Sequence, residues 1–71
     1  MQIVSTTHKN LGQRIKELLK ENNMTQEDLA FKVEVDRSYM GFVERGEKNP
    51  TLSTLDKIAK ALKVSLPELF R

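Results

Sequence analysis

The side chains best suited to recognition chemistry lie between Thr25 and Thr51, in the stretch TQEDLAFKVEVDRSYMGFVERGEKNPT. The stretch has the pattern of two short helices joined by a tight turn. The second of these helices carries an exposed face of mixed polar side chains. This is the form of a helix-turn-helix, which presents one helix to the major groove of DNA.

The residue types that catalysis or metal binding would need are missing or isolated. The chain has no cysteine and one histidine, His8, which lies near the start of the first expected helix. A lone histidine in such a place is usually a surface residue. Because the chain has no other histidine, a Ser/His/Asp arrangement is not expected. The three glycines are too far apart to cradle a phosphate. We therefore expect no enzyme activity, no cofactor and no metal.

The overall charge is weak evidence for any partner, because the net charge of the 71 residues is only +2. Residues 26–48 hold four basic and six acidic side chains, a net charge of −2. The compensating excess lies in the first helix and in the last third of the chain, at Lys9, Arg14, Lys16, Lys20, Lys57, Lys60, Lys63 and Arg71. This distribution predicts a modest, local phosphate-binding surface whose affinity falls steeply with salt.

The elements that must position these groups are five short helices around one core, an all-α fold. Residues 1–6 are expected to form a tail, and residues 7–71 the domain. The first helix is expected at about 7–22, the second from residue 25, and the third at 37–45. The fourth begins near residue 52 and the fifth after residue 65. Apolar residues at helical spacing predict the buried stripes, namely Leu11, Ile15, Leu18, Leu19, Leu29, Ala30, Val33, Met40, Val43, Leu52, Leu55, Ile58, Ala59 and Leu62.

Capping signals mark where these helices begin. Thr25 with Asp28, and Ser65 with Glu68, have the spacing of a capping box, in which side chain and backbone bond reciprocally. Asp36 is expected to cap the third helix. The cap of the fourth is either Thr51 or Ser53, and Gly46 is expected to stop the third helix.

These residues resemble the Cro/phage-repressor class of helix-turn-helix domains, the XRE family. The resemblance rests on Thr25–Ala30, Ser38-Tyr39, Glu44–Pro50 and Leu55–Leu69, and it covers roughly residues 9–70. The run Val35–Tyr39 most resembles the controller proteins of restriction–modification systems. The resemblance implies a lambda-repressor-like domain that binds double-stranded DNA.

The resemblance also implies which residues meet the bases. Arg37, Ser38 and Phe42 occupy positions where side chains of the recognition helix reach base edges. Arginine can pair bidentately with guanine, which is worth about 1–3 kcal/mol of discrimination. Phe42 is placed to touch a thymine methyl group.

Other matched positions correspond to contacts with the DNA backbone. Gln26 resembles the family's glutamine that binds a phosphate from the start of the second helix, where free N–H groups and the helix dipole attract an anion. Tyr39 resembles a tyrosine that lies against the backbone. Arg45, Lys48 and Asn49 match the loop that holds flanking phosphates, contacts that position the protein on DNA.

Each of these assignments has a structural alternative. Arg37 could be a solvated surface residue or could pair with a neighbouring carboxylate. Tyr39 could serve packing, with its hydroxyl in water. Phe42 could fold against the fourth helix, and Lys48 and Asn49 could simply be turn residues.

Three residues depart from the family pattern. Glu34 stands in a turn position where the family favours Gly or Asn. A left-handed conformation there would cost on the order of 1 kcal/mol, so a reshaped turn is expected. Leu19 replaces an arginine that pairs with the glutamate matching Glu44, so Glu44 is expected to find another cation or to stay solvated. Phe42 replaces a commonly polar or basic residue.

Together these features predict a sequence-specific transcriptional regulator that works in the cytoplasm as a homodimer on a pseudo-palindromic operator. Leu66, Leu69 and Phe70, with the fourth helix, are the expected dimer interface, because an apolar chain end favours a partner. RNA polymerase is a further candidate partner. The alternative is a protein-interaction module, such as the antitoxin of a toxin–antitoxin pair, with secondary DNA binding. No apolar run is long enough to span a membrane, and no signal peptide is expected, because residues 1–10 lack a basic start and a long apolar core.

Overall fold

The computed structural model describes residues 6–71, which form five helices and no strand. The helices are α1 (Thr6–Glu21), α2 (Gln26–Val33), α3 (Arg37–Glu44), α4 (Leu52–Ala61) and α5 (Leu66–Leu69). The expected all-α fold is therefore confirmed. Residues 1–5 of the expected tail and the side chain of His8 lie outside the described part, and the domain bounds stay a prediction.

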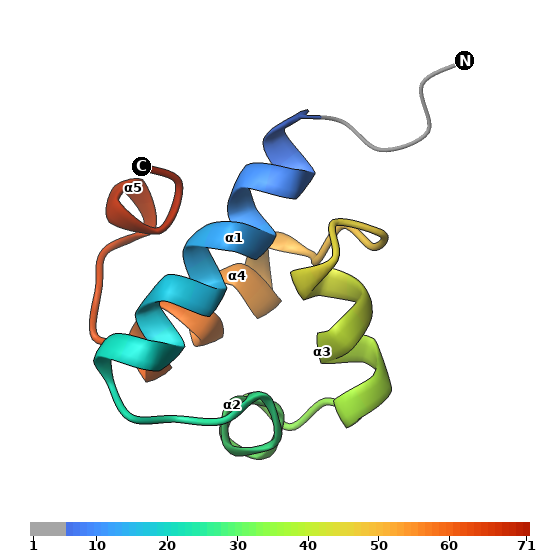
Figure 1. The fold of residues 1–71 in the computed structure, drawn as a ribbon, viewed down its shortest axis with the longest axis vertical. Coiled ribbons are helices and arrows are strands. Elements are labelled where there is room, and N and C mark those ends of the chain that lie inside the picture. The colour runs from blue at the N-terminus through green and yellow to red at the C-terminus, as the bar shows by residue number, and fades with distance from the viewer. Residues whose placement is uncertain (1–5) are drawn as a thin grey trace.

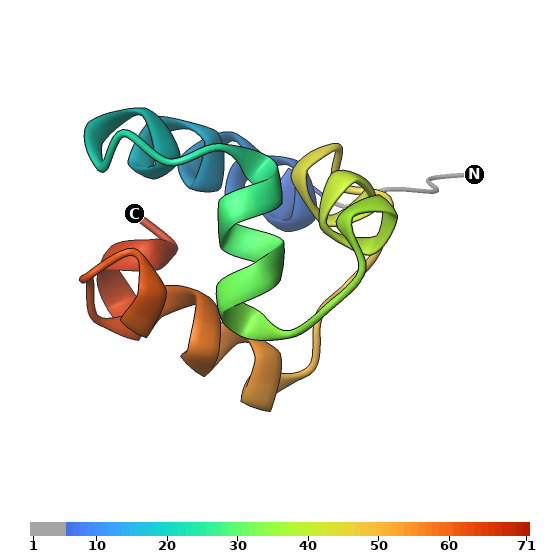
Figure 2. The ribbon, with the colours of Figure 1, turned by 90° about the horizontal axis from the view of Figure 1, so that it is seen from below.

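The five helices pack against one another in pairs. Helix α1 contacts α3 and α5, while α2 contacts α3 and α4, and α4 contacts α5. Figure 1 looks along the axis of α2, with α1 running across the centre of the molecule and α3 at its edge. Turned by 90°, the view shows α2 running from the α1 layer to the α4 layer (Figure 2). Helix α3 lies beside α2 in both views, so the two are joined as a helix-turn-helix.

The core is made of the apolar stripes that the sequence predicts, with one exception. All the predicted stripe residues except Leu52 are at most 9% exposed. Leu52 is 71% exposed, so the prediction for it is wrong. It is the first residue of α4, and the buried stripe begins one turn later, at Leu55. Helical spacing gives the direction of a side chain but not the point along the helix where packing starts.

Reciprocal capping boxes begin α2 and α5, as predicted. Thr25 Oγ1 accepts from the N–H of Asp28 at 3.0 Å, and Asp28 Oδ2 accepts from the N–H of Thr25 at 2.9 Å. Ser65 and Glu68 make the same pair of bonds at 3.2 and 2.9 Å. Because the carboxylates accept these bonds, the pKa values of Asp28 and Glu68 lie below their ordinary values.

The caps of α3 and α4 differ. Thr51 Oγ1 accepts from the N–H of Thr54 at 3.1 Å, so Thr51, rather than Ser53, caps α4. Asp36 is the N-cap residue of α3, as predicted, but its exposed side chain makes no capping bond. Three residues after the cap, where the two capping boxes have an acid, this helix has Tyr39. A reciprocal box is therefore unavailable to α3.

Left-handed residues end four helix segments. Asn23, Glu34, Gly46 and Lys63 have φ between 54° and 76°. After each one, the N–H of the next residue returns to a carbonyl in the last turn, at 2.8 to 3.0 Å, as in a Schellman motif. The turn at Glu34 is therefore not reshaped, contrary to expectation. The glutamate adopts the left-handed conformation directly.

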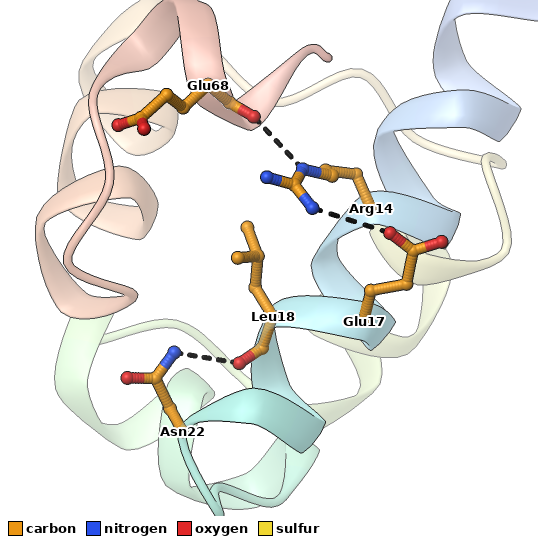
Figure 3. Close-up of polar contacts among 5 residues, drawn as sticks. All are labelled: Arg14, Glu17, Leu18, Asn22 and Glu68. Atoms are coloured by element: carbon orange, nitrogen blue, oxygen red, sulfur yellow. Dashed lines mark hydrogen bonds and ion pairs between the residues drawn. The ribbon is translucent and has the colours of Figure 1, made fainter.

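Two polar side chains fasten the end of the chain to α1. Arg14 Nε donates to the carbonyl oxygen of Glu68 at 3.0 Å, and its Nη1 lies 3.5 Å from Glu17 Oε1. Asn22 Nδ2 donates to the carbonyl oxygens of Leu18 and Leu62, at 2.8 and 3.3 Å. Figure 3 shows Arg14 pointing from α1 toward α5. Arg14, counted above in the basic excess, thus stabilises the fold.

No described helix is long and apolar enough to cross a membrane.

Candidate nucleic-acid interface

The start of α2 provides unpaired backbone donors beside α3. The capping box occupies the N–H of Asp28, whereas the N–H groups of Gln26 and Glu27 have no partner within the described residues. The half-buried side chain of Gln26 reaches toward α3, where its Oε1 would lie 3.6 Å from a Cβ added to Gly41. An anion at this helix end would meet free donors and the positive end of the dipole.

The first turn of α3 is open to solvent on its outer side. Arg37 and Ser38 are exposed, and Asp36 leaves the N-terminal N–H groups of the helix without a side-chain acceptor. Tyr39 is half-buried and packs against the core cluster, which supports its packing role without testing phosphate contact. The inner side is closed, because Met40 and Val43 are fully buried.

The end of α3 carries an aromatic ring between two cations. Phe42 is 37% exposed, with Arg45 Cζ at 5.1 Å and Lys48 Nζ at 5.6 Å from its ring centroid. These distances are those of cation–π contacts. Arg45 also pairs with Glu47, Nε to Oε2 at 3.3 Å. The ring, together with the Glu47 carboxylate, therefore holds two of the predicted phosphate-binding side chains near the recognition helix.

The loop after α3 brings Lys48 and Asn49 to the surface. Both residues are exposed, while the following Pro50 is buried and anchors the loop. The predicted base-reading and phosphate-binding residues thus come from three consecutive segments, the start of α2, the outer side of α3 and this loop. Their contacts with DNA remain predictions.

Glu44 lies where neither sequence-based expectation put it. Its side chain is only 7% exposed, its Oε2 has no hydrogen-bond partner, and it makes no ion pair within the described residues. Helix α3 approaches α1 so closely that a Cβ on Gly12 would overlap the Glu44 carbonyl oxygen. This approach carries Glu44 into the junction of the two helices. The expectation of a solvated or ion-paired Glu44 is therefore wrong.

The expected dimer residues do not share one environment. Leu69 is fully buried within the protomer, so its side chain is not available to a partner, and that part of the prediction is wrong. It fills the space between α5 and the core because α5 is held against both α1 and α4. Leu66 is half-buried, and Phe70 is 44% exposed. These two residues remain the accessible part of the predicted dimer interface.

Sequence reasoning missed Phe31, which at 83% is the most exposed large apolar side chain among the described residues. The signal was present, because Phe31 lies outside the stripe formed by Leu29, Ala30 and Val33. A helix turns about 100° per residue, so Phe31, two positions after Leu29 and two before Val33, lies on the opposite side of the helix from this stripe.

No group of three or more potential metal ligands occurs among the described residues.

Comparison with known proteins agrees with this geometry. Residues 15–69 match the family described as Helix-turn-helix. The chain is similar to the control protein C.SmaI of Serratia marcescens, with 49% identity over 63 residues, 78% of this chain and 75% of that protein. It is also 46% identical over 56 residues to the immunity repressor protein of Bacillus phage phi105. That match covers 79% of this chain but only 39% of the repressor.

Two solved structures extend the likeness to three dimensions. The restriction–modification controller protein C.AhdI from Aeromonas hydrophila has a TM-score of 0.87 and 42% identity, covering 93% of this chain and all of that one. The biofilm regulator SinR in complex with DNA has a TM-score of 0.79 and 37% identity, covering 86% and 98%. At these identities both the fold and the sequence pattern are shared.

Proposed function

Because the chain belongs to the Helix-turn-helix family, we propose that it is a transcriptional regulator that binds double-stranded DNA sequence-specifically. The observation that supports this most directly is the outer side of α3. Arg37 and Ser38 are exposed at its first turn, and no side chain caps that end. The similar protein SinR has been solved in complex with DNA. In this proposal α3 enters the major groove.

The proposed roles of the side chains follow from their positions. Arg37 would pair with a guanine, Ser38 would adapt to its neighbouring base, and Phe42 would contact a thymine methyl group. The remaining five residues would hold the DNA backbone and so fix the register of α3. These are Gln26, Tyr39, Arg45, Lys48 and Asn49.

We further propose a homodimer with two-fold symmetry. Exposed Phe70 and half-buried Leu66 provide an apolar surface at α5, a helix that Arg14 and Leu69 hold rigidly to the body. A two-fold dimer would read a pseudo-palindromic operator with half-sites about 34–36 Å apart.

The biological role that we propose is that of a restriction–modification controller, since C.SmaI and C.AhdI are among the similar proteins. Such a regulator would act by occupying DNA near a promoter, where it would block or recruit RNA polymerase. We propose a cytoplasmic location and no enzyme activity, because the proposed ligand is DNA and the relatives are regulators. None of the relatives reported above favours the antitoxin alternative.

The proposal can be tested by selecting binding sites from a random duplex pool and measuring affinity for the selected sequence against salt. A palindromic consensus with a steep salt slope is expected. Arg37→Ala should relax preference at one base position in each half-site. Lys48→Ala should weaken all duplexes alike and reduce the salt slope by about one per protomer, or about two for a dimer on one operator. No enrichment from folded, dimeric protein would contradict the proposal.

A further inference from the structure

A buried carboxylate lies directly behind the proposed DNA-binding surface. Glu44 is the last residue of α3, and a pocket of about 400 Å³ beside it is lined by residues of α1 and by Gln26 of α2. Oxygen Oε2 of Glu44 has no hydrogen-bond partner in the part of the chain that the structure describes. An unpaired oxygen of a buried carboxylate is costly, so such a group needs an explanation beyond packing.

The charges around Glu44 are few and do not neutralise it by direct pairing. From α1, Lys16, Glu17 and Lys20 line the same pocket. From the end of α3, Arg45 is turned toward the Phe42 ring and pairs with Glu47. Burial raises the pKa of the Glu44 carboxyl above its ordinary value. The side-chain hydrogen bond from Gln26 and the charges of Lys16 and Arg45 lower it by less.

The pocket that holds this carboxylate is shared with the residue proposed to hold a phosphate. Gln26 is the first residue of α2, and its side chain lines the same pocket as the Glu44 carboxylate, whose pKa it lowers as a hydrogen-bond donor. Oε1 of Gln26 lies on the Gly41 side, 3.6 Å from a Cβ added to that glycine. An amide that donates one N–H to Glu44 would still have its second N–H for a ligand.

We propose that Glu44 is a positioning residue for Gln26 and that it takes up a proton when the protein binds DNA, so that affinity for DNA falls as pH rises. The inference rests on the proposed function. A phosphate held by Gln26 would bring a negative charge close to a carboxylate that is already poorly solvated. The same phosphate backbone would draw Arg45 away from Glu44 and remove a charge that favours ionisation. Both changes stabilise the protonated carboxyl.

The sign of the effect follows from linkage. An acid whose pKa is higher in the complex than in the free protein binds protons on association, so the complex weakens as pH rises between the two pKa values. One proton per protomer limits the change to about tenfold in affinity per pH unit, or about a hundredfold for a dimer on one operator. Protonated Glu44 would keep its contact with Gln26, because the uncharged carboxyl still has an acceptor oxygen.

The test is the affinity for the selected operator at fixed salt between about pH 5 and pH 8, with His8→Gln as the background because histidine titrates in this range. We expect the dissociation constant to rise with pH in that background. Glu44→Gln, which is uncharged and similar in shape, should bind at all pH values about as tightly as the parent does at low pH. A flat profile for the parent, or an unchanged slope in Glu44→Gln, would overturn the proposal.

A purely structural role is distinguished by two further measurements. A structural Glu44 would change the melting temperature when replaced but would leave the pH slope of binding unaltered. Carbon NMR of the Glu44 carboxyl in the unmodified protein, free and bound to the operator, reports its protonation without any substitution. A carboxyl that stays ionised in the complex would contradict us. Failure to bind any duplex at any pH would instead count against the proposed function itself.

Discussion

Helices α2 and α3 have the same length, eight residues each, yet they are stabilised in different ways. Helix α2 begins with a reciprocal capping box, so its first turn is fixed by bonds within its own segment, while Leu29, Ala30 and Val33 pack its body into the core. Helix α3 has no side-chain cap, and its backbone instead lies directly against α1 at Gly12. The helix proposed to read DNA thus keeps its first turn free for a ligand, since tertiary packing rather than local bonding holds it in place.

The largest effect is expected from disrupting the backbone contact between α3 and α1. Gly12→Ala would put a Cβ into the backbone of Glu44, and neither backbone can yield without moving a helix. We expect a loss of stability of about 1–3 kcal/mol or more, although alanine alone favours a helix over glycine. Denaturant unfolding measures it.

Gly41→Ala is the matched control for that experiment. An added Cβ there meets the ends of two side chains, Arg45 Nη1 at 3.2 Å and Gln26 Oε1 at 3.6 Å, both of which can move. We expect stability to be unchanged or raised by up to about 1 kcal/mol. Equal losses in both variants would show that α3 is not seated by its backbone at Gly12.

The two helix starts can be compared directly by removing each cap. Thr25→Ala deletes the acceptor for the Asp28 N–H and should cost about 1 kcal/mol. Asp36→Ala deletes a side chain that makes no capping bond and should change stability by well under half of that. Thermal unfolding of the pair is sufficient. A larger loss of stability for Asp36→Ala than for Thr25→Ala would mean that α3, rather than α2, depends on its N-terminal cap.

A substitution in the turn between α2 and α3 is expected to raise stability rather than lower it. Glu34 holds φ 61° and ψ 45°, a left-handed conformation that disfavours a residue with a Cβ. Glu34→Gly should raise the unfolding free energy by up to about 1 kcal/mol, while Glu34→Ala keeps the strain and should show no gain. Chemical denaturation of both variants decides between them, and equal stability would mean that the turn is unstrained.

The smallest expected effect is the response of the α2 cap to acid. Bonds from the backbone N–H and side chain of Thr25 lower the pKa of Asp28 below its ordinary value of 3.8. Its contribution to stability is therefore present above that value and is lost as pH falls through the lower, folded-state pKa. Asp28→Asn should unfold with a weaker dependence on pH below about 4. An identical acid profile would remove Asp28 from the cap.

Local signals in the sequence were sufficient for most of the fold. The capping boxes at Thr25 and Ser65 and the stop at Gly46 depend on residues within one turn, so they could be read without knowing any tertiary contact. The buried stripes depend only on helical period and are equally local. The existence and order of the five helices could therefore be predicted.

The errors concern residues whose surroundings come from distant segments. Burial of Glu44 follows from the approach of α3 to Gly12, thirty-two positions earlier in the chain. Leu52, at the start of α4, is exposed, and Leu69, at the end of α5, is buried. Both outcomes depend on how these helices lie against their neighbours. The candidate site could be predicted as a set of positions, but the pocket shared by Gln26 and Glu44 could not, because only tertiary packing brings their two helices together.

The contact at Gly12 has a consequence for how such proteins diversify. The atoms that meet there are a glycine Cα and a backbone carbonyl, which are the same whatever side chains the outer side of α3 carries. Substitutions at positions 37, 38 and 42 should therefore change the proposed DNA sequence preference without shifting the proposed recognition helix. A lineage can acquire new operators by exchanging a few surface residues, provided that this one glycine is kept.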